Sequence, residues 1–196
     1  MAEETVVNRV QRRRAATVEE ILEAAWVLAA QDGLAGLSLR HLAGRLQMRP
    51  QSLAWYFPSK NSLYDALYAR GHEDFRRRLA EAGPLDVPSA ARSFAAFCVE
   101  NPPRYQLMTQ RTVPGFVPSD SAAALARETF GAWRRALQRA GVNDRAHVDV
   151  LTALVKGLVD QQITVDPTGD RYLRHLEFVI DMFTRAVASH PPIGAA

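Results

Sequence analysis

Arginine, glutamine, serine and aromatic side chains gather in residues 38–60, SLRHLAGRLQMRPQSLAWYFPSK. An arginine guanidinium matches the O6 and N7 acceptors of guanine, and a glutamine amide pairs with N6 and N7 of adenine; each bidentate pair discriminates by about 1–3 kcal/mol. Serine, lysine and tyrosine suit phosphate oxygens, which set the register of a protein on DNA without reporting its sequence. The side chains of this stretch therefore suit the recognition of double-stranded DNA.

The same stretch predicts two helices joined by a tight turn. Ser38 stands where an N-cap is expected, and apolar residues follow it at helical spacing up to Leu46. The next three residues are enough only for a turn. Pro50 suits the first position of a new helix, because its missing N–H would have no partner there. This is the helix-turn-helix arrangement, whose second helix enters the DNA major groove.

Residues 1–14 precede this motif and are polar and without periodicity. We expect a flexible basic arm, in which Arg12-Arg13-Arg14 either form a solvated tail or contact phosphates or the minor groove. The pattern Thr17-Val18-Glu19-Glu20 is typical of a capping box and predicts the start of the first helix, which stops near Gly33.

A longer helix is predicted after the motif, capped by Asn61 or Ser62 and ended by Gly83-Pro84. The segment GPLDVP is the best linker in the chain and marks a boundary between domains. The predicted organisation is a basic arm (1–14), a helix-turn-helix domain (15–60), a connecting helix (61–82), a larger C-terminal domain (83–190) and a tail (191–196).

Two long helices with apolar stripes are predicted over residues 145–163 and 170–188, and no convincing strand or internal repeat is present. The chain is therefore expected to be all-α. The two stripes can pack inside one subunit, or pair with a second copy as a four-helix bundle. The candidate dimer residues are Leu151, Leu154, Val155, Leu158, Leu176, Val179, Ile180 and Phe183.

The net charge of +3 lies wholly in residues 1–80, which hold 12 Lys/Arg and 9 Asp/Glu, whereas residues 81–196 hold 12 of each. This asymmetry hints at a polyanion partner for one end of the molecule. The single cysteine, Cys98, excludes an intramolecular disulfide and fits a reducing compartment. With no secretory signal and no apolar run of about 20 residues, we expect no membrane partner and a cytoplasmic, nucleoid-associated location in a bacterium.

Residues typical of catalytic or metal centres are scattered rather than grouped. Cys98 lacks a histidine partner in the pattern, and no Ser/His/Asp set or carboxylate pair is evident. We therefore expect a protein that is not an enzyme and has no cofactor and no metal. The histidines, which show no metal-ligand spacing, are His41, His72, His147, His175 and His190.

Residues 37–67, LSLRHLAGRLQMRPQSLAWYFPSKNSLYDAL, resemble the TetR/AcrR family of bacterial transcriptional regulators. The resemblance is carried by HLAGRL in the first helix, by LAWYFPSK at the end of the second and by LYDAL in the next. It is specific over roughly the first 75 residues. It implies about nine helices: three form the DNA-binding domain, and the larger C-terminal domain binds a small-molecule effector and forms a homodimer.

The resemblance also implies which residues contact DNA. The positions that face the bases are Arg40 in the first helix and Arg49, Pro50, Gln51 and Ser52 at the start of the second. The positions that contact the DNA backbone are Ser38, Trp55, Tyr56 and Lys60.

Two residues depart from the family's pattern. Gln47 stands where the family usually has glycine, so we expect an altered turn or a strained backbone there. Ala54 replaces a usual tyrosine whose hydroxyl often meets a phosphate, so Trp55 or Tyr56 would have to compensate. Phe57 is expected to pack the short helix onto its neighbours rather than to touch DNA.

An effector cavity is expected among the helices from 61 to 163. Apolar walls with a few polar groups describe small-molecule sites, and they also describe ordinary core. Asp160 is suggestive because an unpaired buried carboxylate is costly; it either pairs with an arginine or Lys156, or faces water at the dimer seam. The candidate lining residues are Phe94, Phe97, Cys98, Tyr105, Met108, Phe116, Trp133, Asp160 and Gln161.

The leading hypothesis is a dimeric repressor that a small-molecule effector releases from a palindromic operator. One alternative is an architectural DNA-binding protein without an effector. A C-terminal core without a sizeable pocket would favour this alternative. Another is a helical enzyme or carrier, which would need a catalytic constellation.

Overall fold

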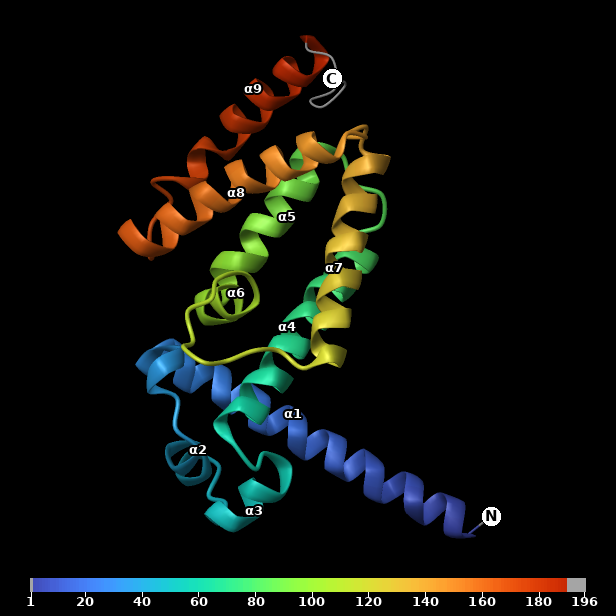
Figure 1. Cartoon of the computed structure of the whole chain (residues 1–196), viewed down its shortest axis with the longest axis vertical. Coiled ribbons are helices and arrows are strands. Elements are labelled where there is room, and N and C mark those ends of the chain that lie inside the picture. Colours follow the sequence, from blue (N-terminus) through green and yellow to red (C-terminus); the bar gives the residue numbers. More distant parts are fainter. Residues whose placement is uncertain (1, 190–196) are drawn as a thin grey trace.

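The protein is all-α over the part that the computed structural model describes, the backbone of residues 2–189 and the side chains of residues 9–189 (Figure 1). This confirms the predicted fold class, while the predicted tail, 191–196, lies outside the described residues. The helices are α1 (Ala2–Gly36), α2 (Leu39–Arg45), α3 (Pro50–Tyr56), α4 (Lys60–Glu81), α5 (Val87–Glu100), α6 (Pro102–Thr109), α7 (Asp120–Arg139), α8 (Arg145–Val165) and α9 (Leu176–Ser189), with a 3-10 turn, η1 (Leu173–His175).

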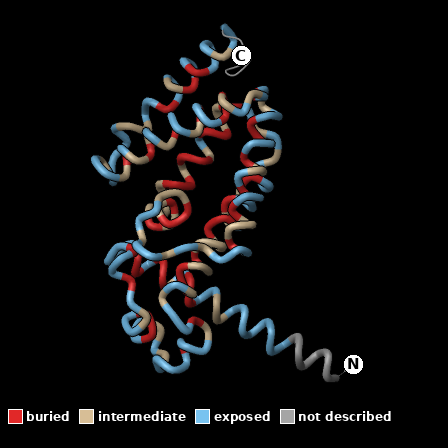
Figure 2. The backbone as a smooth tube through the Cα atoms, in the orientation of Figure 1, coloured by how far each residue is buried: buried red, intermediate tan, exposed pale blue. Residues whose placement is uncertain are grey.

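Two apolar cores lie one after the other along the molecule, and α4 contributes to both. The N-terminal core joins α1, α2 and α3 to the first turns of α4, which insert Leu63 and Leu67. The C-terminal core joins α5, α7, α8 and α9 to the later turns of α4, which insert Phe75 and Leu79. The buried residues accordingly face inward on α4, α5 and α7 (Figure 2). A movement of α4 would therefore change the packing of both cores.

Helix α1 begins at Ala2, so the prediction of a flexible arm over residues 1–14 is wrong from residue 2 onward. This stretch has neither glycine nor proline, and its many Glu, Gln and Arg residues are good helix formers, so a helix forms without an apolar face. The capping box predicted from Thr17 is also wrong. Thr17 lies inside α1, where its hydroxyl donates to the carbonyl oxygen of Arg13 at 3.1 Å. The predicted stop is confirmed by Gly33, whose φ of 72° interrupts the helix.

Helix α4 is capped by Ser59 rather than by Asn61 or Ser62 as predicted. The Ser59 side chain accepts from the backbone N–H of Ser62 at 3.0 Å, and the Ser62 side chain accepts from the backbone N–H of Ser59 at 3.1 Å. Ser62 is thus the second member of a reciprocal capping box. This box fixes the angle at which the chain leaves α3 and enters α4.

The stripes on α8 and α9 are mostly core, so for most of the candidate dimer residues the structure supports the alternative of packing inside one subunit. Repeating apolar residues mark a buried face, but they do not say whether the cover comes from the same chain. Val179 and Leu158 are half-buried and Leu154 is exposed. The buried members, all packed in the C-terminal core, are Leu151, Val155, Leu176, Ile180 and Phe183.

The connection between α8 and α9 is held by the buried amide of Gln162. Its oxygen accepts from the backbone N–H groups of Tyr172 at 2.9 Å and Leu173 at 3.2 Å, and its nitrogen donates to the carbonyl oxygen of Gly169 at 3.0 Å. The apolar stripe predicted from residue 170 therefore becomes a helix only at Leu176, after the 3-10 turn.

None of the described helices combines the length and apolar character needed to cross a membrane. Within the described residues, no three His, Cys, Asp or Glu side chains form a group that could hold a metal ion.

Candidate nucleic-acid interface and ligand cavity

The turn between α2 and α3 is a Schellman motif, and it puts Gln47 in the left-handed region at a φ of 53°. The backbone N–H of Gln47 donates to Gly44 at 3.1 Å, and that of Met48 donates to Ala43 at 2.9 Å. These two bonds satisfy carbonyl groups at the end of α2. The strained backbone expected at Gln47 is therefore present, because the motif needs a positive φ where no glycine is available.

Helix α3 is short and is anchored by two apolar side chains on its inner face. Pro50 occupies the first turn, as predicted, and Ser38 caps α2, with its side chain accepting from the backbone N–H of His41 at 3.5 Å. Leu53 is 1% exposed and Phe57 is 5% exposed. The packing role expected for Phe57 is thus confirmed, and the outer face of α3 is left free.

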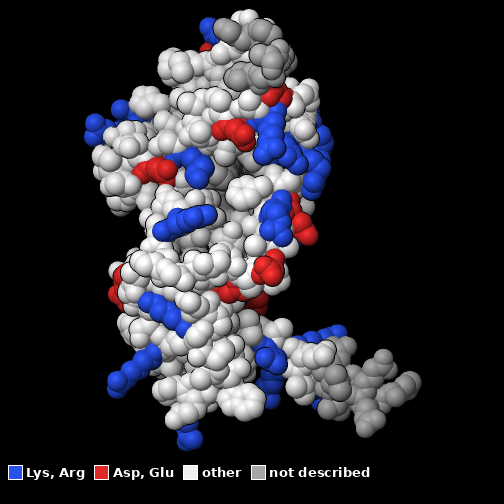
Figure 3. Space-filling view, viewed as in Figure 1, with Lys and Arg blue, Asp and Glu red and all other residues white. Residues whose placement is uncertain are grey.

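The predicted base-facing side chains are all on the solvent side of this motif. Trp55 also lies there and is 86% exposed, which is unusual for so large an apolar ring. Tyr56 is half-buried. Lys and Arg side chains project from this end of the molecule on the face that Figure 3 shows, without acidic neighbours. The exposed predicted residues are Ser38, Arg40, Arg49, Pro50, Gln51, Ser52 and Trp55.

Lys60, predicted to bind a phosphate, makes an intramolecular bond. Its ammonium donates to the carbonyl oxygen of Ala35 at 2.7 Å and lies 5.5 Å from the ring centroid of Tyr64. The Tyr64 hydroxyl donates to the carbonyl oxygen of Leu34. Both side chains thus join the start of α4 to the end of α1.

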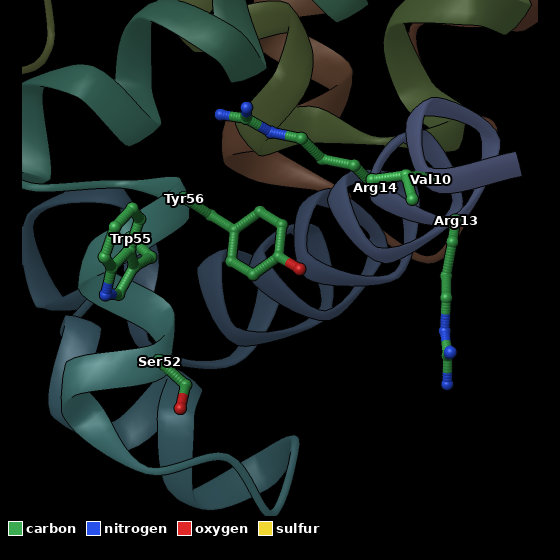
Figure 4. A pocket seen from close by; sticks show the side chains of 6 residues that line it. All are labelled: Val10, Arg13, Arg14, Ser52, Trp55 and Tyr56. Carbon is green, nitrogen blue, oxygen red and sulfur yellow. The ribbon is translucent and has the colours of Figure 1, made fainter. Parts of the chain in front are cut away.

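An open cleft of about 490 Å³ separates the N-terminal turns of α1 from α3. Val10, Arg13 and Arg14 line one side, and Ser52, Trp55 and Tyr56 line the other. Tyr56 points toward α1, while the two arginines extend from α1 in different directions (Figure 4). The cleft combines exposed cations with aromatic and hydroxyl groups beside α3.

A second cavity region lies among α4, α5, α6, α7 and α8 and comprises two compartments that share lining residues. The inner chamber, about 90 Å³, is walled by aromatic side chains and Met108. The outer vestibule, about 490 Å³, lies beside it. Met108, Thr109, Phe130 and Lys156 line both. The predicted residues that line the chamber are Phe94, Phe97, Cys98, Tyr105, Met108 and Trp133, and Phe116 lines the vestibule.

Asp160 and Gln161 line neither compartment, so their assignment to the cavity is wrong. The Asp160 carboxylate accepts from the Tyr105 hydroxyl at 2.6 Å and from the Gln110 side chain at 2.8 Å, and Gln161 is exposed. Asp160 therefore has neutral partners rather than the cation that was considered. Burial, and then the bond to Asp160, raise the pKa of Tyr105, so its hydroxyl stays protonated and donates.

His72 on α4 lines the chamber, although the sequence analysis considered it only as a metal ligand. It is 1% exposed, and burial lowers the pKa of its imidazole to about 4, so the ring is neutral near pH 7. Both ring nitrogens lack a hydrogen-bond partner. Cys98 is buried nearby, and burial raises the pKa of its thiol, which makes it a poor nucleophile.

Comparison with known sequences places the motif in a defined family. The sequence model of the family described as "Bacterial regulatory proteins, tetR family" matches residues 21–67. The HTH-type transcriptional regulator Rv1816 of Mycobacterium tuberculosis (strain ATCC 25618 / H37Rv) is 33% identical over 110 residues. This match covers 52% of the chain and 47% of Rv1816, so the chain spans about half the length of the curated relatives it matches.

Residues 21–67, which hold the helix-turn-helix, therefore match the TetR family. Solved structures have a similar fold over most of the chain. The regulatory protein SCO4313 is 21% identical with a TM-score of 0.71, over 92% of this chain and 98% of that one. The multidrug binding protein EbrR, complexed with ethidium, is 22% identical with a TM-score of 0.58, over 90% of this chain and 97% of that one. At these identities the likeness shows the fold alone.

Two groups of residues at these sites come from outside the motif. Arg13 and Arg14, for which phosphate contact from a flexible arm was one of two expectations, and Val10, which was not predicted, reach α3 as part of the longer helix α1. His72 and Phe130 reach the chamber because α4 and α7 pack side by side. The helix-favouring composition of residues 2–14 was a usable signal for the first group. No local pattern signals the second.

Proposed function

We propose that the protein is a ligand-responsive transcriptional repressor that binds a palindromic operator as a homodimer. The observation that carries the proposal is the exposed outer face of α3, where Arg49, Gln51, Ser52 and Trp55 surround a helix held from within by Leu53. These side chains can donate to and accept from base edges in the major groove. A DNA partner would locate the protein at the bacterial nucleoid.

The basic turns of α1 extend this surface across the cleft to the DNA backbone. Arg13 and Arg14 lie beside Trp55 and Tyr56, and neither arginine has an ion pair with a described residue. A phosphate between α1 and α3 would meet guanidinium and hydroxyl groups together. This phosphate contact would add to those of Trp55 and Tyr56, which must compensate for the tyrosine hydroxyl that is missing at Ala54.

Replacing Arg13 and Arg14 by alanine is expected to weaken binding to any DNA sequence similarly and to make the slope of log K against log salt shallower by about 4, because the dimer loses four phosphate contacts and each contributes about one. Fluorescence anisotropy between 50 and 300 mM salt measures this slope. The matched control is Arg134→Ala with Arg135→Ala, which removes the same charge from exposed positions on α7. An unchanged slope in the α1 variant would remove α1 from the interface.

A homodimer is supported by apolar side chains left uncovered on α8 and α9. Val150 and Leu154 on α8 are 42% and 37% exposed, and Phe178 and Met182 on α9 are 63% and 48% exposed. They lie at helical spacing on their helices, at the end of the molecule farthest from α3 (Figure 1). Packing this face against its copy would form a four-helix bundle and place two reading helices on successive major grooves.

Replacing Phe178 and Met182 by glutamate is expected to give a folded monomer, because four like charges would meet across the bundle. Sedimentation velocity measures the mass, and circular dichroism checks the helix content. Thr184→Glu, which is also exposed on α9 but lies on another face of the helix, is the control and should leave a dimer. A double variant that sediments as the wild type would move the dimer seam to another surface.

An effector role is supported by the chamber and vestibule, which favour a ligand-responsive protein over an architectural one. EbrR, a protein of the same fold, is complexed with ethidium. Helix α4 carries His72 and Phe75 in the chamber wall, and its first turn bonds to α1 through Lys60. Arg70 on α4 also pairs with Glu19 on α1. A ligand that shifts α4 would therefore favour a dimer with wrongly spaced reading helices.

The test of the proposed function is a gel shift with the DNA upstream of the protein's own gene. Retarded DNA that unlabelled specific competitor releases, and random competitor does not, is the expected result. Equal competition by both would reduce the protein to a nonspecific DNA binder.

A further inference from the structure

The neutral imidazole of His72 is an unpaired hydrogen-bonding group in the chamber wall. Such a ring has one N–H donor and one acceptor nitrogen, and both are buried without a partner. Its neighbours are rings: Tyr68 at 4.6 Å and Phe130 at 5.9 Å between centroids, both edge-on. Buried polar groups are nearly always hydrogen-bonded, so this exception needs an explanation. A ligand that supplies the missing partner is one.

The chamber itself suits one aromatic ring. Its walls include a cluster in which Phe75 lies 4.9 Å from Phe97 and 6.0 Å from Trp133, and Phe94 lies 5.3 Å from Trp133, all tilted. Tilted and edge-on arrangements at these distances are favourable for aromatic rings. At about 90 Å³, the chamber is far smaller than the roughly 300–1,000 Å³ of drug-sized sites, a range into which the vestibule falls.

Positive charge without a counter-ion lies in the wall that the chamber and the vestibule share. Lys156 lines both compartments, and its ammonium lies 5.9 Å from the ring centroid of Tyr105. Arg111 lines the vestibule. Within the described part of the chain, no carboxylate lies within 4 Å of either cation, and Asp160, one turn from Lys156, is bonded to Tyr105 and Gln110 instead. The vestibule therefore favours an anionic group.

We propose that the two compartments together bind a small aryl carboxylic acid. Its ring lies in the chamber, a ring hydroxyl bonds to His72, and its carboxylate lies at Lys156 and Arg111. The inference deepens the proposed effector role and rests on it for biological meaning, but binding is measured without DNA. It assigns the hydroxyl to a ring that lacks a hydrogen-bond partner and the carboxylate to cations that lack a counter-ion.

Phe130 and Met108 are two of the side chains that line both compartments. Phe130 is 52% exposed although it lies on the inner side of α7 beside His72, and Met108 is a flexible side chain. Rotation of these two side chains would open the chamber and bring His72 within reach of a ligand. Neither movement requires a change in the backbone.

Isothermal titration with three related probes tests the chemistry of the ligand. The probes are 3-(4-hydroxyphenyl)propanoate, 3-phenylpropanoate and 3-phenylpropanamide. We expect the hydroxylated acid to bind most tightly, the plain acid about 2- to 10-fold more weakly for one neutral hydrogen bond, and the amide at least about tenfold more weakly than the plain acid for the lost charge interaction. An amide that binds as well as the acid, or no binding by any probe at millimolar concentration, would overturn the proposal.

Two variants tie each preference to its residue. The variant Lys156→Gln with Arg111→Gln should bring the acid and the amide within about threefold of each other, because both cations that distinguish them are gone. His72→Phe should remove the preference for the hydroxyl while raising the melting temperature, since an unpaired buried polar group is replaced by an apolar ring. The control is Arg127→Gln, an exposed position on α7 outside the cavity. If both variants keep the preferences of the wild type, the assignment is wrong. The melting temperature shows separately whether each variant is folded.

Failure of this inference and failure of the proposed function give different results. If the protein retards operator DNA but binds none of the probes, the proposed DNA-binding function stands and the proposed ligand class is wrong. A protein that binds the hydroxylated acid, but whose operator complex does not respond to it, keeps the ligand site and loses the effector role.

Discussion

Replacing Arg49 by alanine is expected to weaken binding by about 1–3 kcal/mol for each half-site of the operator, or roughly 5- to 150-fold per half-site, and to relax the choice of base at one position in each half-site. Arg49 is exposed at the N-cap of α3, where its backbone fixes the helix start while its side chain makes no capping bond. The side chain is therefore free to reach a guanine. Fluorescence anisotropy on the wild-type operator and on single-base variants measures both effects.

Gln51→Ala supplies a second position on the same face, with a similar loss expected at a different base pair. The control is Arg45→Ala, an exposed arginine in the last turn of α2 and not on the reading helix. Any loss of affinity in this variant should be equal for specific and random DNA. If Arg49→Ala lowers affinity uniformly across the base variants, Arg49 contacts phosphate rather than bases.

The helix-turn-helix could be predicted because each of its signals is local. The cap at Ser38, the proline at the start of α3 and the strained turn at Gln47 depend on residues no more than five positions apart. The conformation of Gln47 is forced by the carbonyl groups that α2 leaves unbonded, and these are fixed by where α2 ends. Sequence alone therefore carries the geometry of the motif.

The start of α1 could not be placed from the same kind of signal. A capping box at Thr17 needs a residue before it that ends the helix, and residues 2–16 contain none. Once the helix continues, the Thr17 hydroxyl bonds to the preceding turn instead of to the following one. Two local rules competed, and the continuity of good helix formers prevailed.

The contacts of Lys60, and the burial of the apolar residues on α8 and α9, depend on distant parts of the chain. Lys60 meets the carbonyl oxygen of Ala35, which lies 25 residues earlier. Leu151 and Ile180 are buried by other helices of the C-terminal core, whereas Phe178 is not. Helical spacing shows which residues share a face, but tertiary packing decides which face is covered.

Replacing Trp133 by alanine is expected to destabilise the C-terminal core by about 3–5 kcal/mol, the usual range for removing a large buried aromatic side chain. Trp133 is 4% exposed, stacks against Phe75 and Phe94, and donates its indole N–H to the Thr152 hydroxyl at 3.1 Å. Alanine would both enlarge the chamber and leave Thr152 without this donor. Chemical denaturation followed by circular dichroism at fixed protein concentration measures the change.

Phe130→Ala is the matched control on the same helix, since Phe130 is 52% exposed and three residues before Trp133. Its expected cost is below about 1.5 kcal/mol, because little of its apolar surface is removed from water on folding. The two variants separate core packing from access to the chamber: Trp133→Ala should lower stability, and Phe130→Ala should mainly speed the entry and exit of a bound acid. Equal destabilisation by both would mean that Phe130 is covered in the folded protein, as it would be if the dimer seam reached α7.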